Sequence, residues 1–290
     1  MDDLDLEVGE GSLYGFLGPN GAGKTTTIRM ALGLIFPTEG TVEVLGEPVR
    51  AGAPAFRRVG ALIEEPAFWP FLSGRRNLQY LARSAGPRAD CDARLGRVEE
   101  VLGLVDLEDS ANKKVKAYSH GMRQRLGIAS ALLGEPRVLI LDEPTNGLDP
   151  GGMREMRTLL RRLASEGTTV FVSSHLLFEV EAMCDRVAVL AHGRLIAEGA
   201  PSELRRASDR LRIDVDDRPR AEQLLAGLGS VSVDTGAEGP LRVRLSEPAT
   251  AASVNAALVR AGIAVHALQP EQDSLEDAFV HLVEGEDSPR

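Results

Sequence analysis

The sequence predicts an α/β fold with a central, mainly parallel β-sheet. Apolar stretches with strand spacing alternate along the chain with stretches of helical spacing, which is typical of parallel strands joined by helices. The segment 137–141 is almost wholly apolar, as expected of a strand that is buried on both faces. A glycine-rich loop at 18–23 joins one predicted strand to the next helix. The 290 residues suffice for one large domain or two modest ones.

The first two hundred residues contain most of the predicted elements. Leu4, Leu6 and Val8 alternate with acidic residues, which predicts a half-buried strand. Further strands are expected at 12–17, 41–45, 59–63, 137–141, 168–173, 187–190 and 194–197, and helices at 24–35, 73–85, 91–104, 119–133, 153–165 and 176–183. The last two strands are predicted to form a hairpin around a His-Gly turn.

The pattern changes after about residue 206, and we place a domain boundary near 204–209. Strands are expected at 211–215, 231–234, 241–245 and 263–268, and helices at 221–228, 251–261 and 274–283. This β-α-β-β-α-β order resembles a small ferredoxin-like α+β unit. The predicted domains are therefore 1–204 and 209–290, and the second carries no recognisable chemical motif.

Charge and composition exclude several classes of function. Lys plus Arg number 33 and Asp plus Glu number 43, so the formal net charge is −10. Such an acidic charge disfavours wide nucleic-acid binding, which needs a basic face, and we expect no nucleic-acid partner. A local basic patch is the alternative. No stretch approaches the roughly 18 consecutive apolar residues of a membrane span, and the acidic first residues are not expected to be a signal peptide. Cys91 and Cys184 are expected to be unpaired thiols in a reducing cytoplasm.

Residues 18–25, GPNGAGKT, match the phosphate-loop pattern G-x-x-x-x-G-K-[ST]. Glycines let consecutive backbone N–H groups surround a phosphate where a Cβ would intrude. Lys24 is expected to reach the β- and γ-phosphates, and the Thr25 hydroxyl to ligate Mg²⁺. The predicted nucleotide-binding residues here are Asn20, Gly21, Ala22, Gly23, Lys24, Thr25 and Thr26. A glycine-rich turn without a ligand is the alternative.

Two acidic residues, Asp142 and Glu143, follow the apolar strand at 137–141. Ligands of open α/β sheets bind at the carboxyl ends of the strands. Asp142 is therefore expected to share a Mg²⁺ ion with Thr25, and Glu143 to polarise a water for attack on the γ-phosphate. The alternative is an acidic strand end that caps the next helix.

A third motif distinguishes among families that share a phosphate loop. Tyr118-Ser119-His120-Gly121-Met122 opens a predicted helix about 20 residues before the acidic strand end. This motif resembles the signature of ATP-binding cassette (ABC) ATPases, usually L-S-G-G-Q, although Tyr118, His120 and Met122 depart from it. Ser119 and Gly121, the residues expected to meet phosphate, are retained. Ser119 also suits an ordinary helix N-cap, which is the alternative.

Further elements occur in the order that the ABC family has. Residues 59–64 resemble the strand that leads to the glutamine loop, with Glu64 where the family usually has Gln. Residues 146–149 resemble the loop whose aspartate, here Asp149, crosses the dimer interface. His175, after the next strand, resembles the switch histidine.

The resemblance covers roughly residues 2–204. It implies a P-loop nucleotidase whose central sheet is accompanied by an antiparallel β subdomain and by a helical subdomain at about 73–134. The C-terminal unit is similar to the accessory domain of some exporter ATPases, among them the bacitracin-resistance type.

ABC ATPases work as head-to-tail dimers, so the resemblance implies that ATP lies between the phosphate loop of one subunit and Ser119 and Gly121 of the other. Each half-site is incomplete, and hydrolysis waits for dimer closure. The implied roles are a general base for Glu143, a γ-phosphate sensor for His175, charge neutralisation for Lys24, and Mg²⁺ ligation for Thr25, Asp142 and Glu64.

The predicted function is ATP binding and hydrolysis in the subunit of an ABC transporter that powers a separate membrane-spanning permease, with export favoured over import. Such a subunit is expected in the cytoplasm, peripheral on the inner face of the cell membrane. One rival is a soluble ABC ATPase of translation or DNA repair, although the chain has a single cassette and no heptad run. The other is a regulatory module that binds ATP without hydrolysing it.

Two features remain open at this level. The family normally has an extra strand, with an aromatic residue that stacks on adenine, ahead of the phosphate loop, and the 17 residues before Gly18 are too few for it. Two explanations for the missing strand remain open. The translation start is assigned too late, or the protein is a naturally shortened member of the family. The loop 66–72, PAFWPFL, is interpreted either as a groove for a partner's coupling helix or as an aromatic anchor of the helical subdomain.

Overall fold

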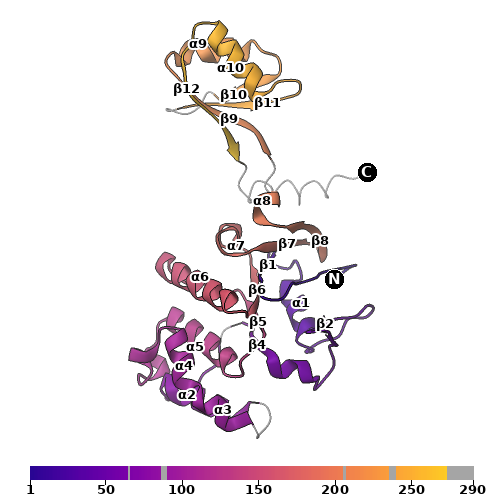
Figure 1. Cartoon of the computed structure of the whole chain (residues 1–290), viewed down its shortest axis with the longest axis vertical. Helices are drawn as coiled ribbons and strands as arrows, with labels where there is room; N and C mark the ends of the chain where they lie inside the picture. The colour runs from indigo at the N-terminus through magenta and orange to yellow at the C-terminus, as the bar shows by residue number, and fades with distance from the viewer. Residues whose placement is uncertain (65, 86–89, 205–206, 235–239, 273–290) are drawn as a thin grey trace. The chain divides into compact units, whose positions relative to one another are not determined.

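The computed structural model describes residues 1–64, 66–85, 90–204, 207–234 and 240–272. The chain forms two compact units, and the division between them falls after Pro201, inside the short helix α8 (Pro201–Leu204). Each unit has its own β-sheet (Figure 1). The predicted helix at 274–283 lies outside the described residues.

The first unit is built on a six-stranded sheet in the order β4-β5-β6-β1-β7-β8. Its strands are β1 (Leu13–Leu17), β4 (Val59–Leu62), β5 (Val138–Asp142), β6 (Thr169–Ser174), β7 (Arg186–Ala191) and β8 (Arg194–Gly199). Neighbouring strands from β4 to β7 are parallel, and β8 returns antiparallel to β7 through the predicted hairpin. The predicted central, mainly parallel sheet is confirmed.

Helices cover both faces of this sheet (Figure 1). On one face, Ile28 of α1 (Lys24–Ala31) packs into a core with Tyr14 and Phe16. On the other face lie α6 (Pro150–Ser165) and α7 (Leu177–Met183). A Cβ at Gly15 of β1 would overlap Val180 of α7, so the glycine lets α7 approach the central strand closely.

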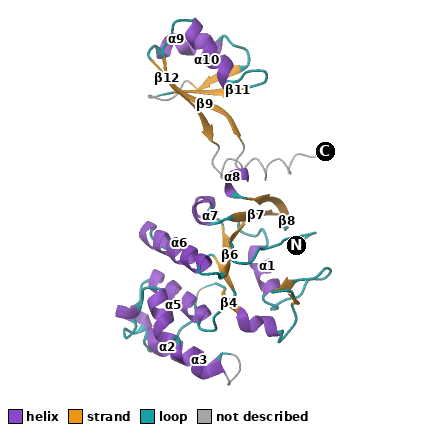
Figure 2. Cartoon of the chain, in the orientation of Figure 1, coloured by secondary structure: helices purple, strands orange, loops and turns teal. Residues whose placement is uncertain are grey.

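A helical subdomain is inserted between β4 and β5 (Figure 2). It contains α2 (Gly74–Ser84), α3 (Cys91–Gly96), α4 (Val98–Leu104) and α5 (His120–Leu132), with 3₁₀ turns η3 (Glu108–Ser110) and η4 (Val115–Ala117) between α4 and α5. The single helix predicted at 91–104 is wrong, because the chain breaks into α3 and α4 at Arg97. Gly96, a poor helix former, directly precedes this break.

The sequence also predicts too great a length for two elements after the phosphate loop. The helix predicted at 24–35 ends at Ala31, because Gly33 takes the left-handed conformation, with φ 66°, that terminates helices. The strand predicted at 41–45 is also shorter than expected, since β2 covers Glu43–Val44. It pairs with β3 (Glu47–Pro48) in an antiparallel hairpin, as expected of the antiparallel β subdomain. The 3₁₀ helix η1 (Pro54–Arg58) connects this hairpin to β4.

The strand predicted at residues 4–8 does not form. Leu4, Leu6 and Val8 are half-buried and pack against the core on the α1 face, while the acidic residues between them are exposed. The alternation therefore predicts correctly which side chains face the protein. The segment nevertheless forms no strand, and β1, the element that follows it, pairs with β6 on one side and β7 on the other.

The second unit has an antiparallel sheet in the order β10-β11-β9-β12, and its described residues include the helices α9 and α10. Its elements are β9 (Ala207–Val215), α9 (Arg218–Ala226), β10 (Val231–Asp234), β11 (Leu241–Leu245), α10 (Ala251–Arg260) and β12 (Val265–Gln272). Leu211, Ile213, Leu225 and Leu258 lie in its separate hydrophobic core. The predicted β-α-β-β-α-β order is confirmed. Within the described ranges of either unit, no helix has the length and apolarity needed to cross a membrane.

Candidate active site

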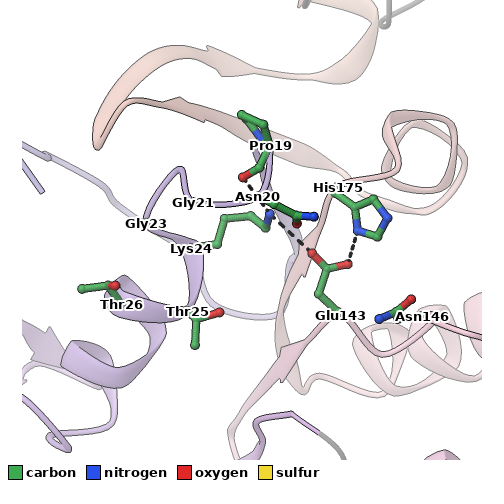
Figure 3. A pocket seen from close by; sticks show the side chains of 10 residues that line it. All are labelled: Pro19, Asn20, Gly21, Gly23, Lys24, Thr25, Thr26, Glu143, Asn146 and His175. Carbon is green, nitrogen blue, oxygen red and sulfur yellow. Dashed lines mark hydrogen bonds and ion pairs between the residues drawn. The ribbon is translucent and has the colours of Figure 1, made fainter.

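A cavity of about 430 Å³ opens at the carboxyl edge of the six-stranded sheet (Figure 3). Its lining comes from the loop after β1, the loop after β5 and the end of β6, three segments that meet because the strands are parallel neighbours. The lining residues are Pro19, Asn20, Gly21, Gly23, Lys24, Thr25, Thr26, Glu143, Asn146 and His175. The structure thus brings most of the predicted phosphate loop together with Glu143 and His175.

The phosphate loop has the backbone geometry of an anion cradle. Gly21 and Gly23 have φ values of 85° and 107°, a region that favours glycine. A Cβ at Gly18 would overlap the carbonyl oxygen of Leu190, so the loop lies directly against β7. Ala22 N–H donates to the carbonyl of Pro19 at 3.1 Å and closes the turn. The N-terminus of α1 begins at the cavity, which favours a negatively charged ligand there.

Lys24 lies buried across the mouth of this loop. Its Nζ donates to the carbonyl of Gly18 at 2.6 Å and lies 3.3 Å from that of Pro19. The same Nζ is 3.4 Å from Glu143 Oε1. The ammonium group therefore stands between the phosphate cradle and the acidic end of β5, where it can neutralise a phosphate.

A cluster of oxygen atoms lies beneath the cavity. The Thr25 hydroxyl donates to Asp142 Oδ2 at 2.8 Å, although 117 residues separate the two in sequence. The Ser173 hydroxyl donates to Asp142 Oδ1 and accepts from Glu143 N–H at 3.0 Å. Asp142 is buried behind Thr25 and does not line the cavity. Carboxylate and hydroxyl oxygens are the ligands that Mg²⁺ prefers, so this donor set fits the predicted ion.

Glu143 and His175 are in direct contact at the open side of the cavity. His175 Nδ1 lies 2.6 Å from Glu143 Oε2, and Figure 3 shows Lys24 and His175 both reaching toward the Glu143 carboxylate. The Glu143 backbone has φ 50°, an uncommon left-handed conformation outside glycine. This twist follows directly after β5 and sets the direction of the Glu143 side chain.

Glu64 lies apart from the other predicted Mg²⁺ ligands. It does not line the cavity, and its Oε1 forms an ion pair with Arg29 Nη2 at 2.6 Å. Both side chains are largely exposed, so the pair is well solvated.

Ser119, Gly121 and Asp149 also lie outside the cavity of their own chain. Ser119 caps α5 by accepting from Met122 N–H at 3.2 Å, and Asp149 caps α6 by accepting from Gly152 N–H at 2.8 Å. These two helix starts are neighbours, because a Cβ at Gly121 would lie 3.4 Å from Leu148.

Asn146 and Ser173 belong to the site although the sequence assigned neither a role. Asn146 lines the cavity, and its carbonyl oxygen lies 2.9 Å from His120 Nε2. His120 thus connects the start of α5 to the loop after β5. A signal for Ser173 was present in the sequence, since it is a polar residue at the end of an otherwise apolar buried strand.

The family follows from a comparison with known proteins. A family model described as "ABC transporter" matches residues 1–146. The chain belongs to the ABC transporter family. Among ABC relatives, the bacitracin transport ATP-binding protein BcrA of Bacillus licheniformis is 41% identical over 98% of this chain and 92% of its own length. The daunorubicin resistance ATP-binding protein DrrA3 of Streptomyces coeruleorubidus is 41% identical over 97% and 90%.

A solved ABC structure resembles the first part of this chain. The ATP-binding cassette MJ0796, in a dimeric post-hydrolysis state bound to ADP and Pi, is 28% identical with a TM-score of 0.57. The similarity covers 67% of this chain and 88% of that one. This ABC protein is accordingly an ATP-binding subunit of a transporter and an ATPase.

Proposed function

We propose that the cavity binds ATP with Mg²⁺ and hydrolyses it only when two copies of the chain close head to tail, and that closure drives export by a separate membrane-spanning subunit. The observation that carries this proposal is the meeting of Lys24, Thr25, Asp142, Glu143 and His175 around one cavity. These residues come from three strand ends and supply a phosphate cradle, oxygen ligands and a carboxylate base together.

Each residue has a proposed role that its contacts support. Lys24 and the loop amides, including those of Asn20 to Gly23 and of Thr26, neutralise and hold the phosphates. Thr25 and Asp142 hold Mg²⁺, which stabilises negative charge on the phosphate oxygens. Glu64 completes this set only after leaving its ion pair with Arg29. Glu143 takes the proton of the attacking water, and His175 contacts the γ-phosphate. A positioned general base typically contributes a factor of about 10²–10⁴ to the rate.

The proposed dimer places Ser119, Gly121 and Asp149 of one copy against the cavity of the other. These residues lie on neighbouring helix starts outside their own cavity, and the Ser119 end of α5 suits an anion. The dimeric state of MJ0796 with ADP and Pi supports a dimer of cassettes. In such a dimer neither copy has a complete site by itself.

The membrane partner is proposed to dock on the loop that follows β4. Trp69 is half-buried and packs on Tyr80 with a ring-centroid distance of 4.3 Å, which supports an anchoring role for this residue. Phe71 is 63% exposed and is free to meet a partner. The names of BcrA and DrrA3, which mention transport and drug resistance, support export. A subunit that powers such a permease is proposed to lie in the cytoplasm, on the inner face of the membrane. Residues 1–204 are the proposed ATPase domain, and 209–290 the accessory domain.

Complementation between two inactive variants tests the head-to-tail proposal. Lys24→Ala removes the phosphate contact but keeps Ser119, whereas Ser119→Arg blocks the signature but keeps Lys24. Mixing the purified variants should create one intact composite site in each mixed dimer and restore up to about a quarter of the wild-type ATPase rate. Folded variants that stay inactive when mixed would contradict the proposed arrangement.

A further inference from the structure

Glu179 is a buried carboxyl group that the roles above leave unused. It lies in α7, four residues after His175, and its side chain is fully buried. The Thr145 hydroxyl donates to Glu179 Oε2, whereas Oε1 has no hydrogen-bond partner among the residues that the structure describes. Burying a carboxyl group with an unsatisfied oxygen is unfavourable, so this group points to a function beyond packing.

Thr145 is the buried residue through which Glu179 reaches the active site. It lies two residues after Glu143, in the loop between β5 and α6, and is 2% exposed. Asn146 N–H donates to the carbonyl of Glu143 at 3.1 Å, and Leu148 N–H donates to that of Thr145 at 3.2 Å. Because these turns make the loop compact, the position of Thr145 fixes where Glu143 and Asn146 lie.

The backbone of Glu143 needs support from its surroundings. Its φ of 50° is a conformation that persists only where neighbouring structure holds it. His175 Nδ1 contacts the Glu143 carboxylate at 2.6 Å, and Glu179 anchors the same loop two residues further on. A single segment, 175–179, therefore holds both the side chain and the following backbone of Glu143.

We propose that Glu179 is a positioning residue for ATP hydrolysis, which holds the 143–146 loop through Thr145 so that Glu143 and Asn146 face the cavity. This inference rests on the proposed role of Glu143 as the base. Burial raises the pKa of the Glu179 carboxyl, because loss of water penalises its charged form. Gln has nearly the same shape as Glu and keeps a side-chain oxygen that can accept from Thr145, so it is the closest mimic.

Single variants test whether the contact controls catalysis. Glu179→Leu leaves the Thr145 hydroxyl without its acceptor, and kcat for ATP should fall about 10- to 100-fold while KM stays within about twofold. Glu179→Gln keeps an acceptor for Thr145 and should hold kcat within about threefold of wild type. An unchanged kcat in Glu179→Leu would overturn the proposal.

A double variant separates positioning from stability. Glu179→Leu with Thr145→Val removes both polar partners, so the melting temperature should return toward wild type because no buried group is left unpaired. The proposal requires kcat to stay low in this well-folded protein, and a wild-type kcat would overturn it.

Thr169→Val is the matched control. Thr169 is a buried threonine at the opposite end of β6, where its hydroxyl oxygen accepts from Gly11 N–H at 2.9 Å. Loss of this hydroxyl should lower the melting temperature without changing kcat. A fall in kcat as large as that of Glu179→Leu would contradict the claim that Glu179 acts locally on the 143–146 loop.

The Glu143→Gln variant separates this inference from the proposed function. If Glu143→Gln hydrolyses ATP normally, Glu143 is not the base and the proposed function fails. If Glu143→Gln is inactive but the double variant has the kcat of the wild-type protein, only the role of Glu179 fails.

Discussion

His175 Nδ1 lies 2.6 Å from Glu143 Oε2, while Lys24 Nζ lies 3.4 Å from the other oxygen of the same carboxylate. Three residues that follow three different strands are thus linked through one carboxylate at the cavity. A carboxylate held at both oxygens has little freedom to turn, which is the condition for a base that acts on a positioned water. The predictions below follow from this arrangement and from its neighbours.

Replacing Lys24 by Ala should weaken nucleotide binding itself. Lys24 is buried, and a hydrogen bond from a charged group is worth about 1.5–3 kcal/mol, so the Kd for ATP should rise about 10- to 100-fold. A titration with a fluorescent ATP analogue measures this change, and Lys116→Ala, at an exposed lysine, is the control. An unchanged Kd for Lys24→Ala would count against the cradle.

Replacing Thr25 by Val should change the dependence on Mg²⁺. Val has the same shape but lacks the hydroxyl that lies 2.8 Å from Asp142, so the Mg²⁺ concentration for half-maximal ATPase activity should rise about 10-fold or more. Thr25→Ser keeps the hydroxyl and should behave like wild type. The same Mg²⁺ requirement in the Val and Ser variants would exclude Thr25 as a ligand.

The stability contribution of Glu179 should depend on pH. Burial raises its pKa above the ordinary value of 4.5 and outweighs the hydrogen bond from Thr145, which lowers the pKa. Arg157, Glu143 and His175 have smaller effects. The folded state then binds more protons than the unfolded state, so the contribution is complete below pH 4.5 and is lost as the pH rises toward the raised pKa.

Thermal unfolding of wild type and Glu179→Gln across a pH series measures this effect. As the pH rises from acid to neutral, the melting temperature of Glu179→Gln should increase relative to that of the wild-type protein. A difference between the two proteins that stays constant over that range would show that Glu179 does not titrate in this way.

Removing the exposed ring of Phe71 should uncouple hydrolysis from transport. Phe71→Ser should leave the ATPase rate of the purified chain unchanged, because the residue lies outside the cavity. Export by the complete transporter should be lost or greatly reduced. Phe36→Ser, at another exposed phenylalanine that lies outside both the cavity and the 175–179 segment, is the control for general effects of removing a surface ring. Normal export with Phe71→Ser would favour a purely anchoring role for this loop.

Local sequence patterns predict the parts of the fold that depend on residues close together in sequence. The phosphate loop joins a strand to a helix as predicted, and Asp142 and Glu143 lie at the end of a buried strand. The segment 4–8 shows the limit of such patterns. Its alternation predicts its burial correctly, but a strand also needs backbone hydrogen bonds to a partner from elsewhere in the chain, which the pattern of one segment cannot reveal.

The contacts that complete the site join residues far apart in sequence. Ser173 connects Asp142 to the backbone of Glu143, and Glu179 connects α7 to Thr145 across 34 residues. No periodicity encodes such a pair, because it exists only once β5, β6 and α7 are in place. Arg29 likewise pairs with Glu64 across 35 residues, which places the expected Mg²⁺ ligand in an ion pair instead.

The most direct measurement of the central claim is the mass and turnover of the Glu143→Gln variant with Mg²⁺ and ATP. Gln keeps the shape of the side chain but cannot accept the proton of the attacking water. The account predicts that this variant binds ATP, elutes in light-scattering chromatography with twice the mass of one chain, and barely hydrolyses the nucleotide. Normal turnover, or ATP-bound protein that remains a monomer, would contradict it.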